Sequence, residues 1–461
     1  MTATDALAAF AADTALDEIP TRVRELTKRH ALDTLSVMLA GSTTAGCRIT
    51  QALFDTLGGT PQATALGTGR RVSVLQAAFA NGEAAHAMDY DDTQLSASPD
   101  RVYGLLMHPS APILGAVLPV AEWSHASGAE LLLAVALGVE VSCKVAEAVS
   151  PTHYGSGFHT TGTIGAFGAA VGAGRLLGLD RTQMVTALGL AASMSAGLRE
   201  NFGTMTKPFH AGRAAENGVL AALRVARGHT ASAGILEAPR GFFAAYGGGD
   251  PVRMTRTMGN PWTAIDPGIS IKPYPSGSLT HPAVDTTIEL AIEHDLRPED
   301  VTSVHVAVNR YMPQALLHDL PTDELEAKFS MRYGVAIGLL DRRAGIPQFS
   351  RARVTSDDAQ TWLRRVVVEV DERADAAGYD QMYSIVSIRL NDGRVLERQA
   401  SFAAGSPSKP MTDEQLAAKV RECLGLVGAR ESDVEQLMQQ TAHLELIPDV
   451  VDLAVLRLSA G

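Results

Sequence analysis

Residues 81–112 gather acids and histidines at a density that suits proton transfer. Asp89, Thr93 and His108 lie within this segment, together with a further histidine, His86. A histidine that is oriented by a carboxylate can accept and return a proton, which is the chemistry needed beside a carboxylate substrate. The segment therefore predicts an active site, with turn formation or helix entry as the alternative interpretation of its single residues.

Three later stretches place cations next to glycine or proline where a helix is expected to begin or end. They are residues 157–159 with His159, residues 203–213 with Lys207, His210 and Arg213, and residues 271–275 with Lys272 and Tyr274, followed by His281. A ligand can approach the backbone closely at such junctions. An unpaired lysine between apolar helices is destabilising, so Lys207 favours a functional interpretation. For His159, Lys272 and His281, packing and ligand contact both stay open.

These cations stand on an acidic chain, whose formal net charge is -12. An acidic protein that binds an anion must concentrate its cations locally, as Lys207, Lys272 and the histidines would do. Arg213 and Arg199 could add a bidentate clamp on a carboxylate. Removing a proton from the carbon next to a carboxylate needs a base, and positive charge near the developing enediolate. The set therefore predicts catalysis on a small polycarboxylate, with Asp89 orienting a histidine.

Motifs that the sequence lacks argue against other classes of protein. There is no Walker A loop, no HExxH and no GxSxG, and the glycines of residues 162–178 follow no expected strand. Close packing of helices explains those glycines better than a dinucleotide site does. Neither a metal nor a cofactor is expected. No basic cluster is present to bind nucleic acid.

Cysteine usage and hydropathy indicate the compartment. Cys47, Cys143 and Cys423 are far apart and match no CxxC spacing, so neither a disulfide framework nor a zinc site is expected. The first residues lack the basic n-region of a signal peptide. No apolar run reaches the roughly 18–20 residues that span a bilayer. We therefore expect a cytoplasmic protein that makes no membrane contact.

Hydrophobic periodicity predicts a mainly α protein. Up to about residue 262 the pattern predicts helices, several of them apolar all round, and no convincing strand. Beyond that point Val304, Val306 and Val308 alternate with other residues, and residues 391–393 (Asn-Asp-Gly) separate two further alternating runs, which indicates strands and a hairpin.

The domain organisation follows from this change of pattern. We expect an all-helical domain (residues 1–265), a smaller α+β lid domain (residues 266–405), and C-terminal helices (residues 406–461) that return to the helical domain. Helices that are apolar all round present more apolar surface than one domain covers, which favours a homodimer formed through the helical domain.

Four motifs, in this order, resemble the MmgE/PrpD family over nearly the whole chain. They are NGxAxHxxDxDD…HPSA from residue 81, GFHxTxxxG from residue 157, KPxHxGxAAxNG from residue 207, and KPYP…H from residue 272. The family includes 2-methylcitrate dehydratases, cis-aconitate decarboxylases and iminodisuccinate epimerases. The resemblance implies a cofactor-free homodimer, with a helical domain completed by the C-terminal helices and the active site in the cleft below the lid domain.

The resemblance also implies particular site residues. Positions used by the decarboxylase branch match Asp89, Thr93, His108, His159 and Lys207, and the tyrosine of an FSxxY stretch matches Tyr333. His210, Arg213, Lys272, Tyr274 and His281 are expected to bind substrate. Two features depart from the family pattern: the stretch between Thr93 and His108 is longer than in the decarboxylases, and Ser276 stands where many relatives have cysteine.

The function expected from these observations is that of a cofactor-independent lyase. It would act on a small di- or tricarboxylate by proton abstraction next to a carboxylate, with loss of water or of CO2. An epimerase of a dicarboxylate such as iminodisuccinate is the alternative. A third hypothesis is a protein that binds a carboxylate without turning it over, which would need the cations but not Asp89 beside acid/base histidines.

Overall fold

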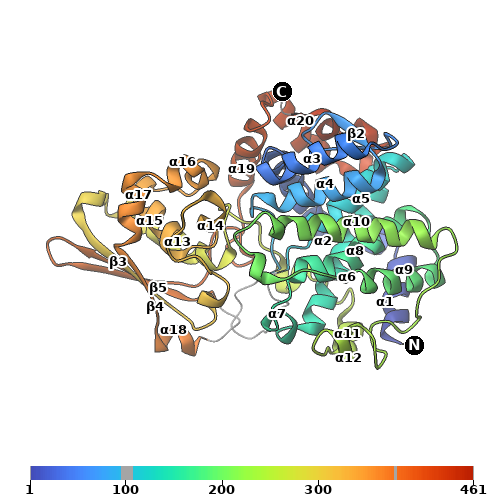
Figure 1. Cartoon of the computed structure of the whole chain (residues 1–461), viewed down its shortest axis with the longest axis horizontal. Coiled ribbons are helices and arrows are strands. Elements are labelled where there is room, and N and C mark those ends of the chain that lie inside the picture. Colours follow the sequence, from blue (N-terminus) through green and yellow to red (C-terminus); the bar gives the residue numbers. More distant parts are fainter. Residues whose placement is uncertain (1, 95–106, 378–381, 460–461) are drawn as a thin grey trace.

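The computed structural model describes residues 2–94, 107–377 and 382–459. The long loop expected after Thr93 therefore lies, as residues 95–106, outside the described residues. Two bodies lie side by side, one helical and one containing a sheet (Figure 1). The expectation of a mainly α protein with a smaller α+β part is confirmed. The boundaries at residues 265 and 405 stay predictions.

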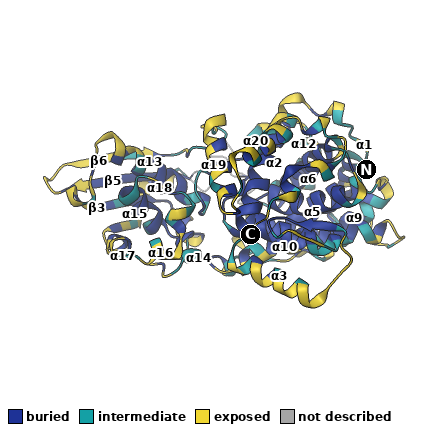
Figure 2. Ribbon diagram, turned by 90° about the horizontal axis from the view of Figure 1, so that it is seen from above, coloured by how far each residue is buried: buried dark blue, intermediate teal, exposed yellow. Residues whose placement is uncertain are grey.

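The helical domain is built from twelve described helices: α1 (Ala3–Asp13), α2 (Thr21–Gly41), α3 (Ala45–Leu57), α4 (Val74–Ala87), α5 (Ser110–Ser124), α6 (Gly128–Val149), α7 (Thr152–Gly155), α8 (Thr160–Leu176), α9 (Arg181–Ser193), α10 (Thr206–Val225), α11 (Phe242–Ala245) and α12 (Pro251–Thr257). Helix α8 packs against α5, α6, α9 and α10, and α4 packs against α5 and α10. Figure 2 shows the buried interior running along α5, α6 and α10.

Glycines of α8 make this packing possible. A Cβ at Gly165 would lie 2.7 Å from Pro112 of α5, and one at Gly168 would lie 2.3 Å from the carbonyl oxygen of Gly138 of α6. Both distances are too short for a side chain, so neighbouring backbones approach as only glycine permits. Close helix packing is thus the reason for the glycine spacing.

The expectation that the helical domain holds no strand was wrong. Two short strands, β1 (Ala63–Ala65) and β2 (Arg70–Val72), pair antiparallel, with Ala63 opposite Val72. Strands of three residues are too short to show an alternating pattern. The signal present in the sequence was Gly67 and Gly69, which both adopt positive φ in the connecting turn.

The lid domain contains a four-stranded sheet in the order β4-β3-β5-β6. Its elements are α13 (His281–Glu293), β3 (Val301–Val308), α14 (Glu324–Ala327), α15 (Met331–Asp341), α16 (Arg351–Val354), α17 (Asp357–Leu363), β4 (Val366–Val370), α18 (Glu372–Ala376), β5 (Ser384–Leu390) and β6 (Val395–Ala400). Strands β3 and β4 are parallel and the other pairs antiparallel. Helix α13 packs on β5 and β6, and α15 packs on β4. The predicted hairpin at residues 391–393 joins β5 to β6.

The last two helices, α19 (Asp413–Gly425) and α20 (Glu431–Ala442), pack against α2 of the helical domain. The N-terminal and C-terminal parts of the sequence therefore share one hydrophobic core, which includes Leu35, Leu39, Val420 and Leu437. Within the described ranges, no helix combines the length and the apolar character needed to cross a membrane.

Candidate active site

The turn that follows α4 places Asp89 at the centre of the site. Helix α4 ends at Ala87, and the N–H of Asp89 donates to the carbonyl of His86 (3.1 Å). Asp89 adopts a φ of +52°, which aspartate tolerates better than most residues because its short side chain can hydrogen-bond locally. The side chain is buried, so its charge must be compensated by neighbours.

Two lysines supply that compensation. Lys207, in the first turn of α10, donates to Asp89 Oδ1 (2.7 Å), and Lys272 donates to the same oxygen (3.0 Å). Burial alone would raise the pKa of Asp89, but the two ammonium groups outweigh burial and hold the pKa well below its usual range. Burial lowers the pKa of Lys207 despite the attraction of Asp89. The lysines of two distant motifs thus meet on one carboxylate.

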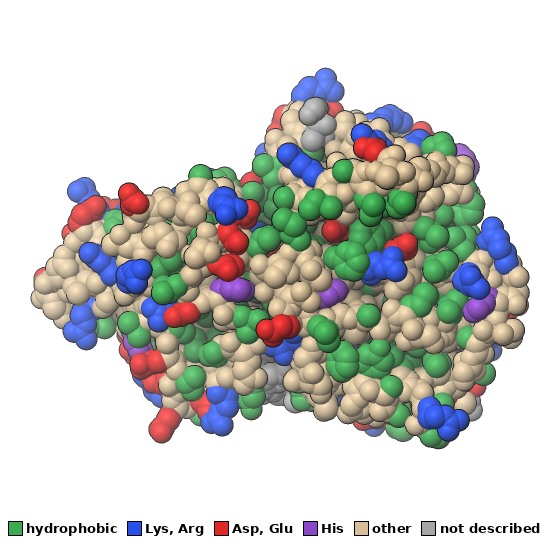
Figure 3. Space-filling model, viewed as in Figure 1, with side chains coloured by type: hydrophobic (Ala, Val, Ile, Leu, Met, Phe, Trp, Pro, Cys, Tyr) green, Lys and Arg blue, Asp and Glu red, His purple; other side chains and the backbone are tan. Residues whose placement is uncertain are grey.

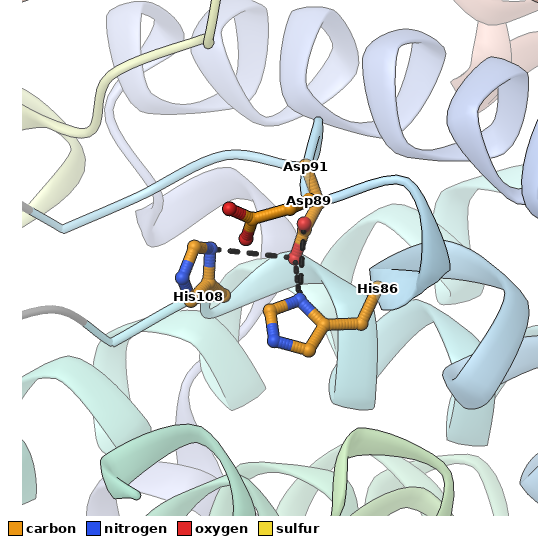
Figure 4. Close-up of side chains that lie close together, drawn as sticks. All are labelled: His86, Asp89, Asp91 and His108. Carbon is orange, nitrogen blue, oxygen red and sulfur yellow. Dashed lines mark hydrogen bonds and ion pairs between the residues drawn. The ribbon is translucent and has the colours of Figure 1, made fainter. Parts of the chain in front are cut away.

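Asp91 orients His86 and lies near His108, whose Nδ1 donates instead to the carbonyl of Asp92 (3.0 Å). Figure 4 shows both rings turned toward the Asp91 carboxylate. His86 Nδ1 lies 2.8 Å from Asp91 Oδ2, and His108 Nδ1 lies 3.5 Å from the same oxygen. Because a carboxylate only accepts, the Nδ1 of His86 donates, and its Nε2 faces the ammonium of Lys207 (2.7 Å). Burial lowers the pKa of both histidines.

His159 contributes a ring nitrogen without a hydrogen-bond partner to the cluster. Its ring stacks on that of His86, with centroids 5.5 Å apart, and its Nδ1 lies 3.0 Å from His210 Nδ1. Its Nε2 is buried without a hydrogen-bond partner. Burial, reinforced by Lys207, holds the pKa of His159 well below the usual value. A buried polar atom without a partner is uncommon and marks a place for a ligand to donate or accept.

Hydroxyl groups complete the side of the cluster that faces the lid domain. Thr93 Oγ1 lies 3.3 Å from His108 Nδ1 and 3.2 Å from the hydroxyl of Ser278. Asp92, by contrast, has a structural role, since it accepts from the backbone N–H (3.1 Å) and the hydroxyl (2.5 Å) of Ser110 at the start of α5. The helix-entry interpretation therefore fits Asp92, whereas Asp91 belongs to the histidine cluster.

A small cavity of about 30 Å³ opens on this cluster. Its wall comes from both domains: Asp89, His108, Tyr154, Phe202, Lys207, Lys272, Gly277, Ser278, Leu279, Ala315, Leu316 and Phe329. A volume of roughly 10–15 Å³ is needed for each water, so a polycarboxylate fits only if the lid segments move outward. A larger cavity of about 520 Å³ lies beside it, with Met88 and Lys328 in its wall. We assign the chemistry to the smaller one because the paired lysines and His108 line it.

The structure does not bring two of the expected residues to this cluster. The Tyr333 hydroxyl donates to the carbonyl of Gln348, and its ring packs against Phe349 in the core of the lid domain. Arg213 lies exposed on α10 and pairs with Glu216. The reason for Arg213 is helical geometry: six residues after Lys207, it points about 120° away from it around the helix.

Two further expected substrate contacts lie within the lid domain. The Tyr274 hydroxyl donates to Asp285 Oδ1 (2.6 Å), and His281 Nε2 lies 3.0 Å from the carbonyl oxygen of Ser276. Burial lowers the pKa of His281 to about 3, so this ring stays neutral at physiological pH. Of the expected contacts, Lys272 lines the cavity, and Thr93 borders it through its contact with Ser278. His210 contacts the Nδ1 of His159.

Two further residues, His86 and Lys328, lie here without a role predicted from the sequence. His86 lies between Asp91 and Lys207, and Lys328 donates to the carbonyl of Met88 (2.7 Å) beside Asp89. Burial lowers the pKa of Lys328 to about 8. A signal existed for both: His86 stands within the HxxDxDD motif, and Lys328 stands between the apolar residues Ala327 and Phe329.

The donor atoms of His86, Asp89, Asp91 and His108 lie within 4.8 Å of one another, a spacing that metal ligands can have. The ammonium of Lys207, however, lies 2.7 Å both from His86 Nε2 and from Asp89 Oδ1. One atom each of His86 and Asp89, two of the four candidate ligands, is thus already in contact with a cation. The residues fit a site whose positive charge comes from lysine better than they fit a metal centre.

Known proteins are similar to this chain over nearly its whole length. The MmgE/PrpD N-terminal domain matches residues 5–255, and the MmgE/PrpD C-terminal domain matches residues 274–444. The chain is 28% identical over 445 residues to a cis-aconitate decarboxylase of Homo sapiens, covering 94% of this chain and 89% of that protein. It is 26% identical over 480 residues to a cis-aconitate decarboxylase of Aspergillus terreus, covering 96% and 93%.

Proposed function

This chain belongs to the MmgE/PrpD family, and from that membership and the geometry of the site we propose that it is a lyase of small di- or tricarboxylates, with decarboxylation of cis-aconitate as its reaction. The observation that carries the proposal is the convergence of Lys207, Lys272 and the unpartnered Nε2 of His159 on one buried cluster. This cluster offers fixed positive charge for carboxylates and a ring nitrogen for proton transfer.

Charge balance explains why such a cluster suits an anionic substrate. Asp89 pairs with the ammonium groups of Lys207 and Lys272, Asp91 hydrogen-bonds to His86, and the histidines are neutral because burial lowers their pKa values. A polycarboxylate that enters adds negative charge, which raises the pKa of neighbouring histidines and lysines. Binding would therefore favour a protonated His159 when a proton has to be delivered.

The proposed reaction proceeds in two steps. The C–C bond to the departing carboxylate breaks and releases CO2, while its electron pair moves into the remaining unsaturated carboxylate as an enediolate. Lys207 and Lys272 stabilise this charge, because cations placed where charge develops act strongly in a water-excluded site. One proton is then delivered to carbon by His159, and solvent restores it to the ring.

A panel of acids tests the proposal. Purified protein is incubated with cis-aconitate, citrate, 2-methylcitrate and iminodisuccinate in deuterated buffer and followed by proton NMR. We expect loss of CO2 from cis-aconitate with deuterium incorporated into the product. New alkene signals from 2-methylcitrate would instead indicate a dehydratase, and exchange without net loss from iminodisuccinate an epimerase. Tight binding of an acid without exchange or turnover would contradict a lyase and indicate a binding protein.

We expect catalysis to need no metal ion. Lys207 already contacts His86 Nε2 and Asp89 Oδ1, two of the atoms that a divalent ion could use. Turnover after dialysis against EDTA should equal that of untreated protein, measured on the same substrate. A loss of activity that Mg²⁺, Mn²⁺ or Zn²⁺ restores would contradict this assignment of the positive charge.

We also propose a homodimer formed through the helical domain. An apolar patch, the α3/α10 patch, consists of Ile49, Leu53, Leu57, Met205 and Phe209, each at least 41% exposed. The ring of Phe79 bridges the two helices, 5.3 Å from Phe209 and 6.4 Å from Phe54. Figure 2 shows α3 as largely exposed, and Figure 3 shows apolar side chains gathered over this region. A second copy would cover a patch of this kind.

Charge placed on the α3/α10 patch should produce a monomer. Leu53→Asp combined with Leu57→Asp introduces two carboxylates where an apolar surface would be buried, which opposes association. Light scattering should give twice the chain mass of 48.6 kDa for the unaltered protein and the chain mass for the variant. Val252→Asp, at an equally exposed position on α12, is the matched control and should stay dimeric. A monomeric unaltered protein at micromolar concentration would refute the dimer.

We further propose that the protein acts in the cytoplasm. All three cysteines, Cys47, Cys143 and Cys423, are free and buried, and burial raises the pKa of each thiol, which keeps it unreactive. Free thiols are typical of proteins from reducing compartments.

A further inference from the structure

Three consecutive carbonyl groups in the turn that carries Asp89 each accept a hydrogen bond from a different lysine. The carbonyl of Met88 accepts from Lys328 (2.7 Å), that of Asp89 from Lys272 (3.0 Å), and that of Tyr90 from Lys419 (2.8 Å). The three lysines come from the lid domain, from the KPYP segment and from α19, parts of the chain far apart in sequence. All three are buried.

Two of these lysines hold a second segment at the same time. Lys328 also donates to the carbonyl of Pro275 (3.2 Å), and Lys419 also donates to the carbonyl of Lys272 (2.9 Å). The Tyr90 hydroxyl adds a bond to the carbonyl of Pro273 (3.1 Å). The turn at residues 88–90 and the segment at residues 272–275 are therefore linked by the ammonium groups of Lys328 and Lys419. Neither ammonium group belongs to the reacting cluster.

We propose that Lys328 and Lys419 are positioning residues that set the spacing between Asp89 and Lys272, so that the site is assembled only when the lid domain and the C-terminal helix are both docked. The kinetic part of this inference rests on the proposed function. Neither lysine reaches the reacting atoms: Lys328 bonds to carbonyls, and the ammonium of Lys419 pairs with Asp33 (2.6 Å) and lies 3.9 Å above the Tyr90 ring.

The physical reason for using lysines lies in the backbone of the turn. Asp89 is held at a positive φ, a conformation that persists only where its surroundings determine it. Each buried carbonyl also needs a donor, and the charged donors make the stronger hydrogen bonds. Loss of one lysine leaves buried carbonyls unsatisfied in both segments, which weakens the hold on Asp89 and on the backbone of Lys272 together.

Lys328→Met tests the proposal most cleanly, because no carboxylate loses its partner. Lys28→Met is the matched control: Lys28 is also buried and also anchors the C-terminal part of the chain, through the carbonyl of Ala442 (3.0 Å) and Glu445 (3.2 Å), but it does not touch the turn. Both variants are compared with the unaltered protein in thermal unfolding, in hydrogen exchange by mass spectrometry, and in turnover of cis-aconitate.

For Lys328→Met we expect exchange about tenfold faster in peptides covering residues 86–94 and 268–277, where the N–H groups of Asp89, Thr93 and Ser270 report on the two segments. We expect kcat to fall about 10- to 100-fold with little change in KM, because displacements near 1 Å reduce catalysis by such factors. Lys28→Met should alter neither exchange in these peptides nor kcat, even where its thermal stability falls as far.

The outcomes separate the proposal from its alternatives. Unchanged exchange in both peptides would overturn it, and a fall in kcat without faster exchange would make Lys328 a catalytic residue instead. Equal effects of the two variants would reduce Lys328 to a general stability role. Should Lys328→Met fail to fold, Lys419→Met with Asp33→Asn replaces it, since the second change removes the carboxylate left behind. If the unaltered protein turns over no acid, the proposed function fails, and hydrogen exchange alone still decides the positioning role.

Discussion

Lys207→Ala is expected to lower kcat about 10²- to 10³-fold, the usual effect of removing one group that stabilises transition-state charge. Its ammonium lies against Asp89 and His86 at the wall of the small cavity, where the proposed function places the substrate carboxylates. The fold should persist, because Asp89 keeps Lys272 as a partner (3.0 Å) and no apolar packing group is lost. Steady-state kinetics on cis-aconitate and thermal unfolding measure the two effects separately.

Lys409→Ala is the control for this experiment. Lys409 is exposed between β6 and α19 and pairs with Asp285 and Glu289 of α13, so its loss should leave turnover unchanged. Full activity of Lys207→Ala, or its failure to fold, would show that Lys207 is structural and that the site is assigned wrongly.

His159→Gln is expected to reduce kcat about 10²- to 10⁴-fold, the range contributed by one acid/base group, while KM changes little. Glutamine can hydrogen-bond to a ligand but cannot exchange a proton. The Nε2 of His159 is buried and unpartnered, so a substrate carbon or carboxylate is the group that it would meet. Deuterium incorporation into product, followed by NMR, should fall in parallel with kcat.

The pH dependence gives a second measurement of the same role. The pKa of His159 in the unliganded protein lies well below the usual value because the ring is buried, so the ring is neutral throughout the neutral range. Because a proton donor must be protonated, kcat/KM should decrease steadily with rising pH across the neutral range and level off only at acidic pH, below the lowered pKa. His210→Gln is the matched control at the neighbouring ring, and a larger effect there than at His159 would reverse the assignment of the acid/base group.

Much of the fold could be predicted from local sequence patterns, because turns and strands depend on residue types that are close together in the chain. The Asn-Asp-Gly turn at residues 391–393 does join two strands, and the alternating valines of residues 304–308 do lie in a strand. The hairpin β1–β2 was not predicted, because strands of three residues are stabilised by pairing with each other. Hydrophobic periodicity does not reveal which segments pair.

The position of Arg213 away from the cluster could have been predicted from the sequence. Lys207, His210 and Arg213 stand at intervals of three residues on one helix, and each interval rotates the side chain by about 300°. Lys207 and His210 therefore share a face, whereas the face has turned away by Arg213. A motif had been treated as one cluster when the helical period divides it between the site and the solvent.

The position of Tyr333 in the core of the lid domain could not have been predicted in this way. Its position in FSxxY says nothing about which surface of α15 meets the cleft. Only the packing of residues 346–349 against α15 decides that the hydroxyl bonds to the carbonyl of Gln348 and that the ring faces Phe349.

The sequence by itself determined the chemistry available to this protein: buried lysines, carboxylates and histidines at helix–loop junctions, on an acidic chain, in the motif order of the MmgE/PrpD family. The tertiary structure alone decided which of them meet. Lys207 and Lys272 reach the same oxygen of Asp89, while Lys328 from the lid domain and Lys419 from α19 donate to the neighbouring carbonyls. Residue types depend on local chemistry, but distances between charges depend on how separate helices pack, and no local pattern contains that packing.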